Sequence, residues 1–193
     1  RLHEGKLALD LDEENWASVI KGAVADLSLQ AQVYGKVINY TIEANVPTVA
    51  ADKTSITEVL NNLVDNALKY SGNSPKIEIH AYVNQDGLVE TTVRDWGVGI
   101  PSTVMPHLFE KFRRNYRNQA RIGGTGLGLF LSSQLVEAHG GHIWVRSKEG
   151  EGTTISFTLQ PYKQLAGSQK SSNNRDIERT AHGWIKNHSL YRR

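Results

Sequence analysis

Glycines cluster in the segment GGTGLGLFL, which runs from Gly123 to Leu131. Gly124, Gly126 and Gly128 stand just before and inside the start of an apolar run with helical spacing. Glycine lets backbone N–H groups come close to a ligand, and the N-terminus of a helix favours an anion. The pattern therefore suits a polyphosphate, although isolated glycine clusters are also common in turns.

A second candidate segment is RDWGVGIP, in which Asp95 ends an apolar strand immediately before Gly97 and Gly99. A carboxylate at this place can accept a hydrogen bond from an exocyclic amino group. Glycines without a Cβ atom leave room for a flat base. Taken alone, the same residues also describe a turn aspartate with two turn glycines.

The third candidate segment, TEVLNNLVDNALKYS, places Asn62 and Asn66 one helical turn apart. Their stripe also holds Glu58 and Lys69, opposite the apolar face of the predicted helix. Carboxamide oxygens suit Mg²⁺, which prefers oxygen ligands and bridges phosphates. The competing interpretation of this stripe is an ordinary solvated helix face.

Basic residues follow between Met105 and Gly124. They are Lys111, Arg113, Arg114, Arg117 and Arg121. Basic side chains on a mobile lid can close over a triphosphate and offset its charge during phosphoryl transfer. The alternative is a solvated basic helix, of which one or two residues contact nucleotide.

The Walker pattern is absent and the glycines do not spell GxGxxG after a strand, so the two commonest phosphate loops are excluded. With LFEKFRR, from Leu108 to Arg114, the segments together resemble the ATP-binding catalytic domain of bacterial sensor histidine kinases. That domain belongs to the superfamily of DNA gyrase, the heat-shock chaperone of similar fold and MutL. The resemblance extends from about Arg1 to about Pro161.

The resemblance implies ATP and Mg²⁺ as cofactors and gives each segment a role. Asp95 would bond the adenine amino group, Asn66 would hold the metal, and Asn62 would lie close to the phosphates. Lys69 and Tyr70 would contact phosphate or sugar. The residues expected to act in catalysis are Asn62, Lys69, Arg113 and Arg114. Further nucleotide contacts are expected from Gly97, Gly99, Ile100, Gly124, Thr125, Gly126, Leu127, Gly128 and Leu129.

Position 62 bears on the reaction. In the ATP-hydrolysing relatives a glutamate four residues before the metal-binding asparagine serves as general base, whereas Asn62 cannot take a proton near neutral pH. Glu58, one turn further back, would sit about 6 Å away along the helix axis. Transfer to a histidine is therefore favoured over hydrolysis. None of the chain's seven histidines has the surroundings of the family's phosphoacceptor.

We therefore expect a kinase domain that transfers the γ-phosphoryl of Mg-ATP to a histidine on a dimerisation domain outside this chain, and through it serves a response regulator. The intact protein would be a homodimer. The alternatives are a nucleotide-binding signalling module without catalysis and an ATPase of the same superfamily.

Composition agrees with this expectation. A net charge of +2 over 193 residues gives no global argument for nucleic acid or an anionic membrane. The absence of cysteine excludes disulfides and thiol chemistry and fits a cytoplasmic protein. No apolar stretch approaches the roughly 20 residues of a membrane span, so a membrane anchor would lie in segments not present here.

The periodicity predicts helices over 14–31 and 54–70, a strand over 37–42, and hairpins from 76–83 with 89–93 and from 142–147 with 153–160. We expect a two-layer α/β sandwich of the Bergerat type, with helices on one face of a mixed, mainly antiparallel sheet. Residues 1–12 would be the end of a dimerisation-hairpin helix and a connector, with a short strand at Leu7 to Leu11. The ATP-binding domain would span 13–161, and 162–193 would be a linker and basic tail.

Overall fold

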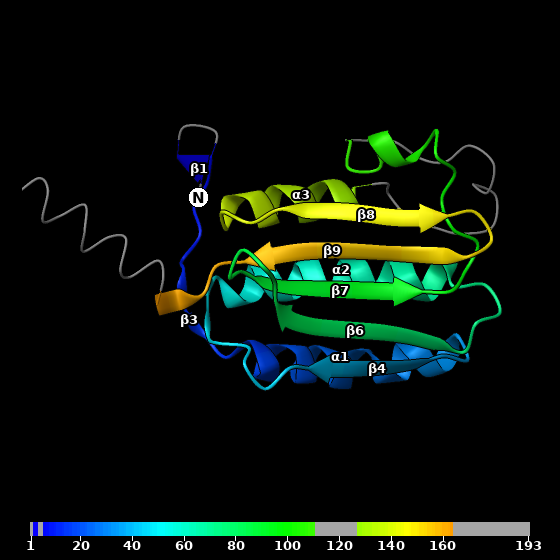
Figure 1. Ribbon diagram of the computed structural model, residues 1–193, viewed down its shortest axis with the longest axis horizontal. Coiled ribbons are helices and arrows are strands. Elements are labelled where there is room, and N and C mark those ends of the chain that lie inside the picture. Colours follow the sequence, from blue (N-terminus) through cyan, green and yellow to red (C-terminus); the bar gives the residue numbers. More distant parts are fainter. Residues whose placement is uncertain (1, 4–5, 111–126, 164–193) are drawn as a thin grey trace, which may run out of the picture.

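A computed structural model of the chain describes residues 2–3, 6–110 and 127–163. In this part of the chain, three helices cover one face of a five-stranded sheet (Figure 1). The strands, in spatial order, are β4 (Val37–Ile42), β6 (Lys76–Val83), β7 (Val89–Asp95), β9 (Gly152–Leu159) and β8 (Ile143–Lys148). Only β4 and β6 pair in parallel, which confirms the predicted mixed, mainly antiparallel sandwich.

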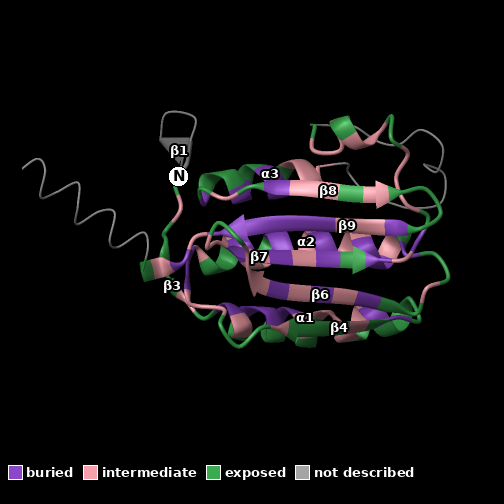
Figure 2. Ribbon diagram, in the orientation of Figure 1, coloured by how far each residue is buried: buried purple, intermediate pink, exposed green. Residues whose placement is uncertain are grey.

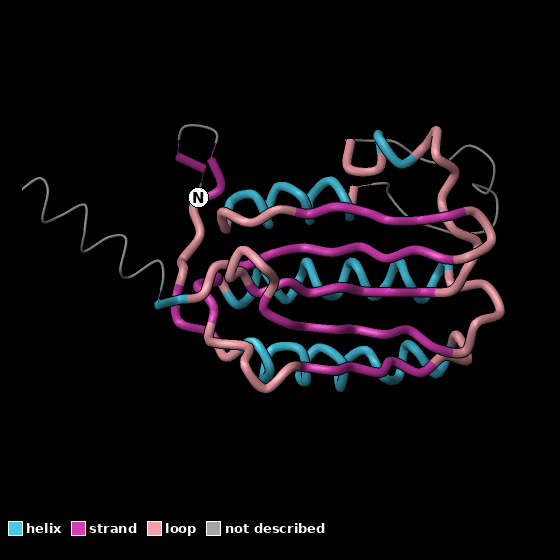
Figure 3. Tube along the Cα trace, viewed as in Figure 1, coloured by secondary structure: helices cyan, strands magenta, loops and turns pink. Residues whose placement is uncertain are grey.

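The helices are α1 (Trp16–Val33), α2 (Lys53–Tyr70) and α3 (Gly128–Ala138), and α2 lies between the other two (Figure 3). Asn15 caps α1 by accepting from the Ser18 amide, and Asp52 caps α2 by accepting from the Ser55 amide. Such caps satisfy N–H groups that the first turn of a helix leaves free, which explains where both helices begin.

Both predicted hairpins are confirmed, and their alternation separates two faces. In β6, Ile77, Ile79 and Ala81 are buried against the helices, while the side chains between them point to the open face. The burial colouring in Figure 2 shows the same alternation along β7. The core therefore lies between sheet and helices, with α2 at its centre, and the end of β7 emerges beside the end of α2.

α2 buries seven residues: Ile56, Val59, Leu60, Leu63, Val64, Ala67 and Leu68. Truncation of a buried leucine such as Leu63 to alanine typically costs about 2–5 kcal/mol. This apolar face fixes the rotation of the helix. It consequently leaves Asn62 and Asn66 half-buried on another side.

The N-terminal expectations need correction. Leu2–His3 (β1) pairs with Lys6–Leu7 (β2) in an antiparallel ribbon, so the expected helix end is wrong for the described residues. The short strand predicted over Leu7 to Leu11 is also misplaced, because the next strand, β3, is Asp12–Glu14. It pairs with β5 (Val49–Ala51). All three residues of β5 are buried, so its sequence lacks the alternation of apolar and polar residues that would predict a strand.

α3 ends at His139, the residue that caps its C-terminus. The ring is 4% exposed; its Nδ1 lies 2.7 Å from the Leu135 carbonyl, and its Nε2 accepts from the Asp52 amide at 3.1 Å. The histidine thus joins the end of α3 to the start of α2. Among the described helices, none is long and apolar enough to cross a bilayer.

Candidate functional site

Asp95 is the last residue of β7 and is only 5% exposed. Its Oδ1 accepts from the Gly97 amide at 2.8 Å. Burial raises the pKa of this carboxyl, while the backbone amides of Gly97 and Thr153 and the charge of Lys36 act in the opposite direction. A carboxylate fixed by backbone amides and shielded from water can discriminate strongly among donors brought to it.

The loop after Asp95 is clamped on both sides. The Val98 amide donates to the Tyr70 carbonyl at 3.2 Å, which ties the loop to the end of α2. The Ile100 amide donates to Ser147 Oγ at 2.8 Å, which ties it to the hairpin of β8 and β9. The predicted residues Tyr70 and Ile100 therefore join the Asp95 loop, each through a backbone group.

Gly97 and Gly99 are needed by the chain's own backbone. A Cβ atom at Gly97 would lie 1.9 Å from the Tyr70 carbonyl oxygen, and one at Gly99 would lie 2.0 Å from the Lys148 carbonyl oxygen. Gly99 also has a φ of +69°, which side chains rarely tolerate. The structure adds a reason of its own for these glycines, because they leave room for the end of α2 and for the β8–β9 hairpin, while the expected room for a base stays a prediction.

Asn62 on α2 faces the start of α3. A Cβ atom at Gly128 would lie 3.8 Å from Asn62 Oδ1, and Asn62 Nδ2 lies 3.5 Å from Ser132 Oγ. Leu127, the residue before the helix, makes no side-chain cap. The first amides of α3 have no partner within their helix, so they form a positive end beside Asn62 that suits an anion.

Asn66 lies one turn along α2 from Asn62 and is half-buried. Its side chain makes no hydrogen bond to the described part of the chain. A carboxamide oxygen that is accessible and uncommitted fits an Mg²⁺ ligand, because this ion takes few protein oxygens and keeps several waters.

Lys69 is directed away from this pair of asparagines. Its Nζ lies 2.5 Å from Asp65 Oδ2, and the bond to Asp65 raises the pKa of the lysine. Asp65 also accepts from Gln30 of α1 at 2.7 Å. Lys69 is thus held on the α1 side of α2, and its expected contact with phosphate stays a prediction.

Several expected residues lie outside the described ranges. They are Arg113, Arg114, Gly124, Thr125 and Gly126. Leu129 lies in the first turn of α3 and packs against the core, which is a structural contact.

Sequence reasoning missed Lys36, which is 8% exposed and donates to the carbonyls of Gly72 and Ser74. It also missed Ser147 and Thr153, which hold the Asp95 loop from the β8–β9 hairpin. Neither spacing nor composition marks these residues, because their role depends on strands far apart in the sequence.

The comparison with known families agrees with this geometry. The family model described as histidine kinase-, DNA gyrase B-, and HSP90-like ATPase matches residues 51–163. The chain belongs to this family. ATP binding follows from membership, and the predicted fold class is confirmed.

The relatives that are similar in sequence include sensor kinases. The chain is 45% identical to the sensor histidine kinase WalK of Bacillus subtilis over 118 residues, which cover 60% of this chain and 19% of that protein. It is 40% identical over 127 residues to the sensor protein kinase WalK of Staphylococcus saprophyticus, and this match covers 62% of this chain and 20% of that protein. The chain therefore spans about a fifth of the length of these relatives.

Solved structures show the same fold. The catalytic domain of the histidine kinase ThkA superposes with a TM-score of 0.67 at 27% identity, covering 79% of this chain and 97% of that one. Full-length ShkA in complex with AMPPNP superposes with a TM-score of 0.71 at 25% identity, and the match covers 79% of this chain and 31% of that one. The chain is a histidine kinase-type ATPase domain, homologous to the catalytic part of sensor kinases.

Proposed function

We propose that this domain transfers the γ-phosphoryl of Mg-ATP to a histidine on a dimerisation domain outside the chain. The observation that carries the proposal is Asn62, which lies against the N-terminus of α3 and cannot act as a base. A water molecule at the phosphates would lack a proton acceptor from this position. The nucleophile would instead be the acceptor histidine.

Each part of the site then has one task. Asp95 accepts from the adenine amino group, the amides at the start of α3 bind phosphate oxygens, and Asn66 holds Mg²⁺. The metal, when bound, offsets the charge that develops on the phosphates. Catalysis by the chain's own residues consists of positioning and charge stabilisation, with Arg113 and Arg114 as the lid cations.

Glu58 is the nearest acidic residue on the same side of α2, one turn before Asn62, and it is exposed. A carboxylate in water at that distance does not replace a base beside the phosphates. Steady ATP hydrolysis should therefore be slow, which separates this domain from the hydrolysing branch of its family.

The partners follow from the same proposal. The WalK relatives are named sensor kinases, so the natural acceptor is a histidine-bearing dimerisation domain, in cis or in trans, and the downstream protein is a response regulator. A homodimer would place this domain beside such a helical acceptor.

Incubation with γ-labelled ATP tests the proposal. The 193-residue chain alone should bind ATP without labelling itself, and an added dimerisation hairpin with its histidine should acquire acid-labile label. The added hairpin should react slowly, because the covalent link and its effective concentration are missing. Brisk phosphate release without an acceptor would favour an ATPase. ATP binding with no transfer to any acceptor hairpin would favour a signalling module without catalysis.

A further inference from the structure

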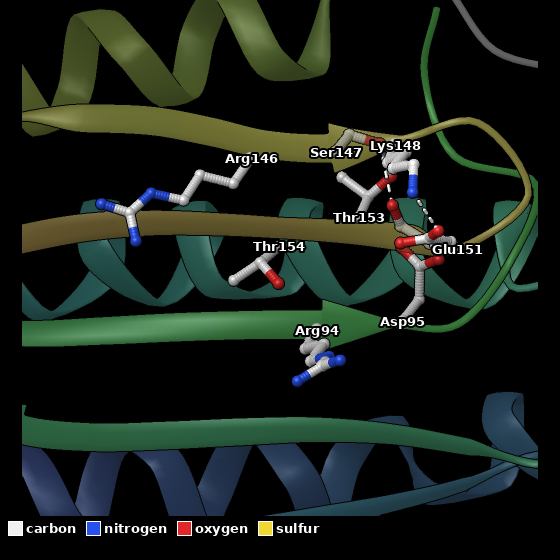
Figure 4. Close-up of a pocket in the computed structure, with 9 residues that line it drawn as sticks. Arg94, Asp95, Arg146, Ser147, Lys148, Glu151, Thr153 and Thr154 are labelled. Carbon is white, nitrogen blue, oxygen red and sulfur yellow. Dashed lines mark hydrogen bonds and ion pairs between the residues drawn. The ribbon is translucent and has the colours of Figure 1, made fainter.

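Two arginines stand side by side on the open face of the sheet. Arg94 on β7 and Arg146 on β8 are both ladder partners of Thr154 on β9. Adjacent strands lie about 4.8 Å apart, so the two arginine Cα atoms are roughly 10 Å apart. Figure 4 shows both side chains on the near side of the sheet, with the helices behind it. Both guanidinium groups can therefore reach one ligand lying over Thr154.

The arginines border a hollow of about 290 Å³. Its lining also includes Ser147, Thr153 and Thr154 (Figure 4). The Thr154 hydroxyl makes no hydrogen bond to the described part of the chain. The hollow thus offers two guanidinium groups and a free hydroxyl to an acceptor.

Nearby carboxylates do not neutralise the arginines. Glu78, the ladder partner of Arg94, pairs with Lys76 at 2.8 Å. Glu151, which lines the hollow, pairs with Lys148. Within the described ranges, neither arginine forms an ion pair.

The third nearby carboxylate is also occupied. Glu90, on the same face of β7, accepts from the Tyr82 hydroxyl at 2.5 Å and from Asn84 at 3.3 Å. Arg94 instead stacks on Trp96, with its Cζ 4.5 Å from the ring centroid. Glu90 keeps its own charge, since both of its donors are neutral, but within the described ranges it forms no ion pair with Arg94 or Arg146, whose guanidinium groups stay open to a ligand.

We propose that this face docks an extended acidic segment of a partner protein. Carboxylates at alternate positions of an extended segment lie about 7 Å apart on one side, a spacing that the two arginines can span. Each guanidinium binds one carboxylate through two parallel hydrogen bonds. Trp96 and the half-buried Trp144 flank the arginines, and tryptophan with arginine is the composition typical of protein interfaces.

A protein segment fits better than a free anion. The arginines are exposed, so a single small ion would be held by two screened contacts of low strength. A segment crossing β7, β9 and β8 adds contacts with Trp96 and Trp144 to the ion pairs. Successive side chains of a strand alternate, so Arg94 faces away from the helix side of β7, where Asp95 is buried. Asp95 nevertheless borders the hollow, so the docked segment would lie next to the Asp95 loop of the candidate site.

Fluorescence anisotropy of the 193-residue chain with a labelled peptide, Gly-Glu-Thr-Glu-Thr-Glu-Gly, tests the proposal at low salt. The double variant Arg94→Gln, Arg146→Gln should bind it about tenfold more weakly. The matched variant Lys21→Gln, Lys53→Gln removes the same charge from exposed lysines on α1 and α2, on the helix side of the sheet, and it should bind within twofold of the parent. A peptide with glutamine in place of glutamate should not bind.

Three results would overturn the proposal: equal loss in both double variants, equal binding of the glutamine peptide, or displacement of the peptide by inorganic phosphate at the peptide's own concentration. The last would indicate a free-anion site. Unchanged melting temperature and ATP affinity in the arginine variant serve as the check that it folds.

Discussion

The two ends of the candidate site are built differently. The base end, from Asp95 to Ile100, is buried or clamped by backbone hydrogen bonds to α2 and to the β8–β9 hairpin. The phosphate end, formed by Asn62, Asn66 and the start of α3, consists of half-buried side chains and amides without helical partners.

The base end is suited to selecting the base, and the phosphate end is suited to adjusting to metal and phosphate. A buried carboxylate costs stability, because its charged form loses water, but it discriminates sharply between a donor and an acceptor. Half-buried carboxamides keep contact with water and can exchange it for metal or phosphate at low cost. The base end therefore lowers the stability of the nucleotide-free domain and gives selectivity, and the phosphate end adapts to its ligand at low cost.

Gly97→Ala should break the base end. Its Cβ would meet the Tyr70 carbonyl at 1.9 Å, so the loop must move, and we expect a loss of about 3 kcal/mol of stability together with ATP binding. Denaturant unfolding and calorimetry measure both. Gly22→Ala in α1 has nothing within 4 Å and should be neutral or stabilising by up to about 1 kcal/mol. A Gly97→Ala variant as stable as Gly22→Ala would contradict the clamp.

Asp95→Asn should separate stability from binding. One acceptor oxygen becomes a donor, so ATP affinity measured by calorimetry should fall by about 1–3 kcal/mol. The empty domain should nevertheless become more stable at neutral pH, because the variant no longer buries a charge. A variant that retains full affinity with an intact fold would refute the adenine role.

The pH dependence of unfolding checks the same residue. Burial raises the pKa of Asp95 in the native state above its ordinary value of 3.8. Between the pKa of the unfolded state and the raised pKa of the native state, the native state binds more protons than the unfolded state. The Asp95 contribution to stability therefore falls as pH rises through that window, and the fall should vanish in Asp95→Asn. Asp52, whose pKa is lowered by the Ser55 amide, should act oppositely, with its stabilisation lost as pH falls.

Asn66→Ala probes the adaptable end. We expect binding of Mg-ATP to weaken several-fold and binding of metal-free ATP to change little, because only the complex uses the carboxamide oxygen. Titrations with and without Mg²⁺ give the comparison. Equal losses under the two conditions would contradict the metal role.

Asp65→Asn and Lys69→Met test whether the lysine is available to phosphate. Each removes a half-exposed pair that contributes at most about 0.5 kcal/mol to stability. If Lys69 turns to the phosphates, ATP should bind somewhat more tightly to Asp65→Asn and more weakly to Lys69→Met. No change in either affinity would assign the lysine to the α1–α2 contact alone.

The smallest effect is expected from removal of residues 167–193. The family match ends at residue 163, and both ends of the described site precede it. ATP affinity and melting temperature should remain those of the full chain. A marked drop in either would place the domain boundary beyond our predicted residue 161.

The sequence alone determined the family, the order of the elements and the two asparagines on one side of α2. These properties depend on local periodicity and on residue types at short spacing, which a single chain displays directly. Its errors fell at the N-terminus, where Asp12–Glu14 pairs with Val49–Ala51 across the chain, because a three-residue strand carries no periodicity of its own.

Only the tertiary structure decided why Gly97 and Gly99 must be glycine, that Lys36 lies near Asp95, and that Lys69 pairs with Asp65. It also placed Arg94 and Arg146 on either side of Thr154. Each of these facts depends on contacts between distant segments. Such contacts are set by sheet register and helix packing, which bring together residues whose identities say nothing about one another in the sequence.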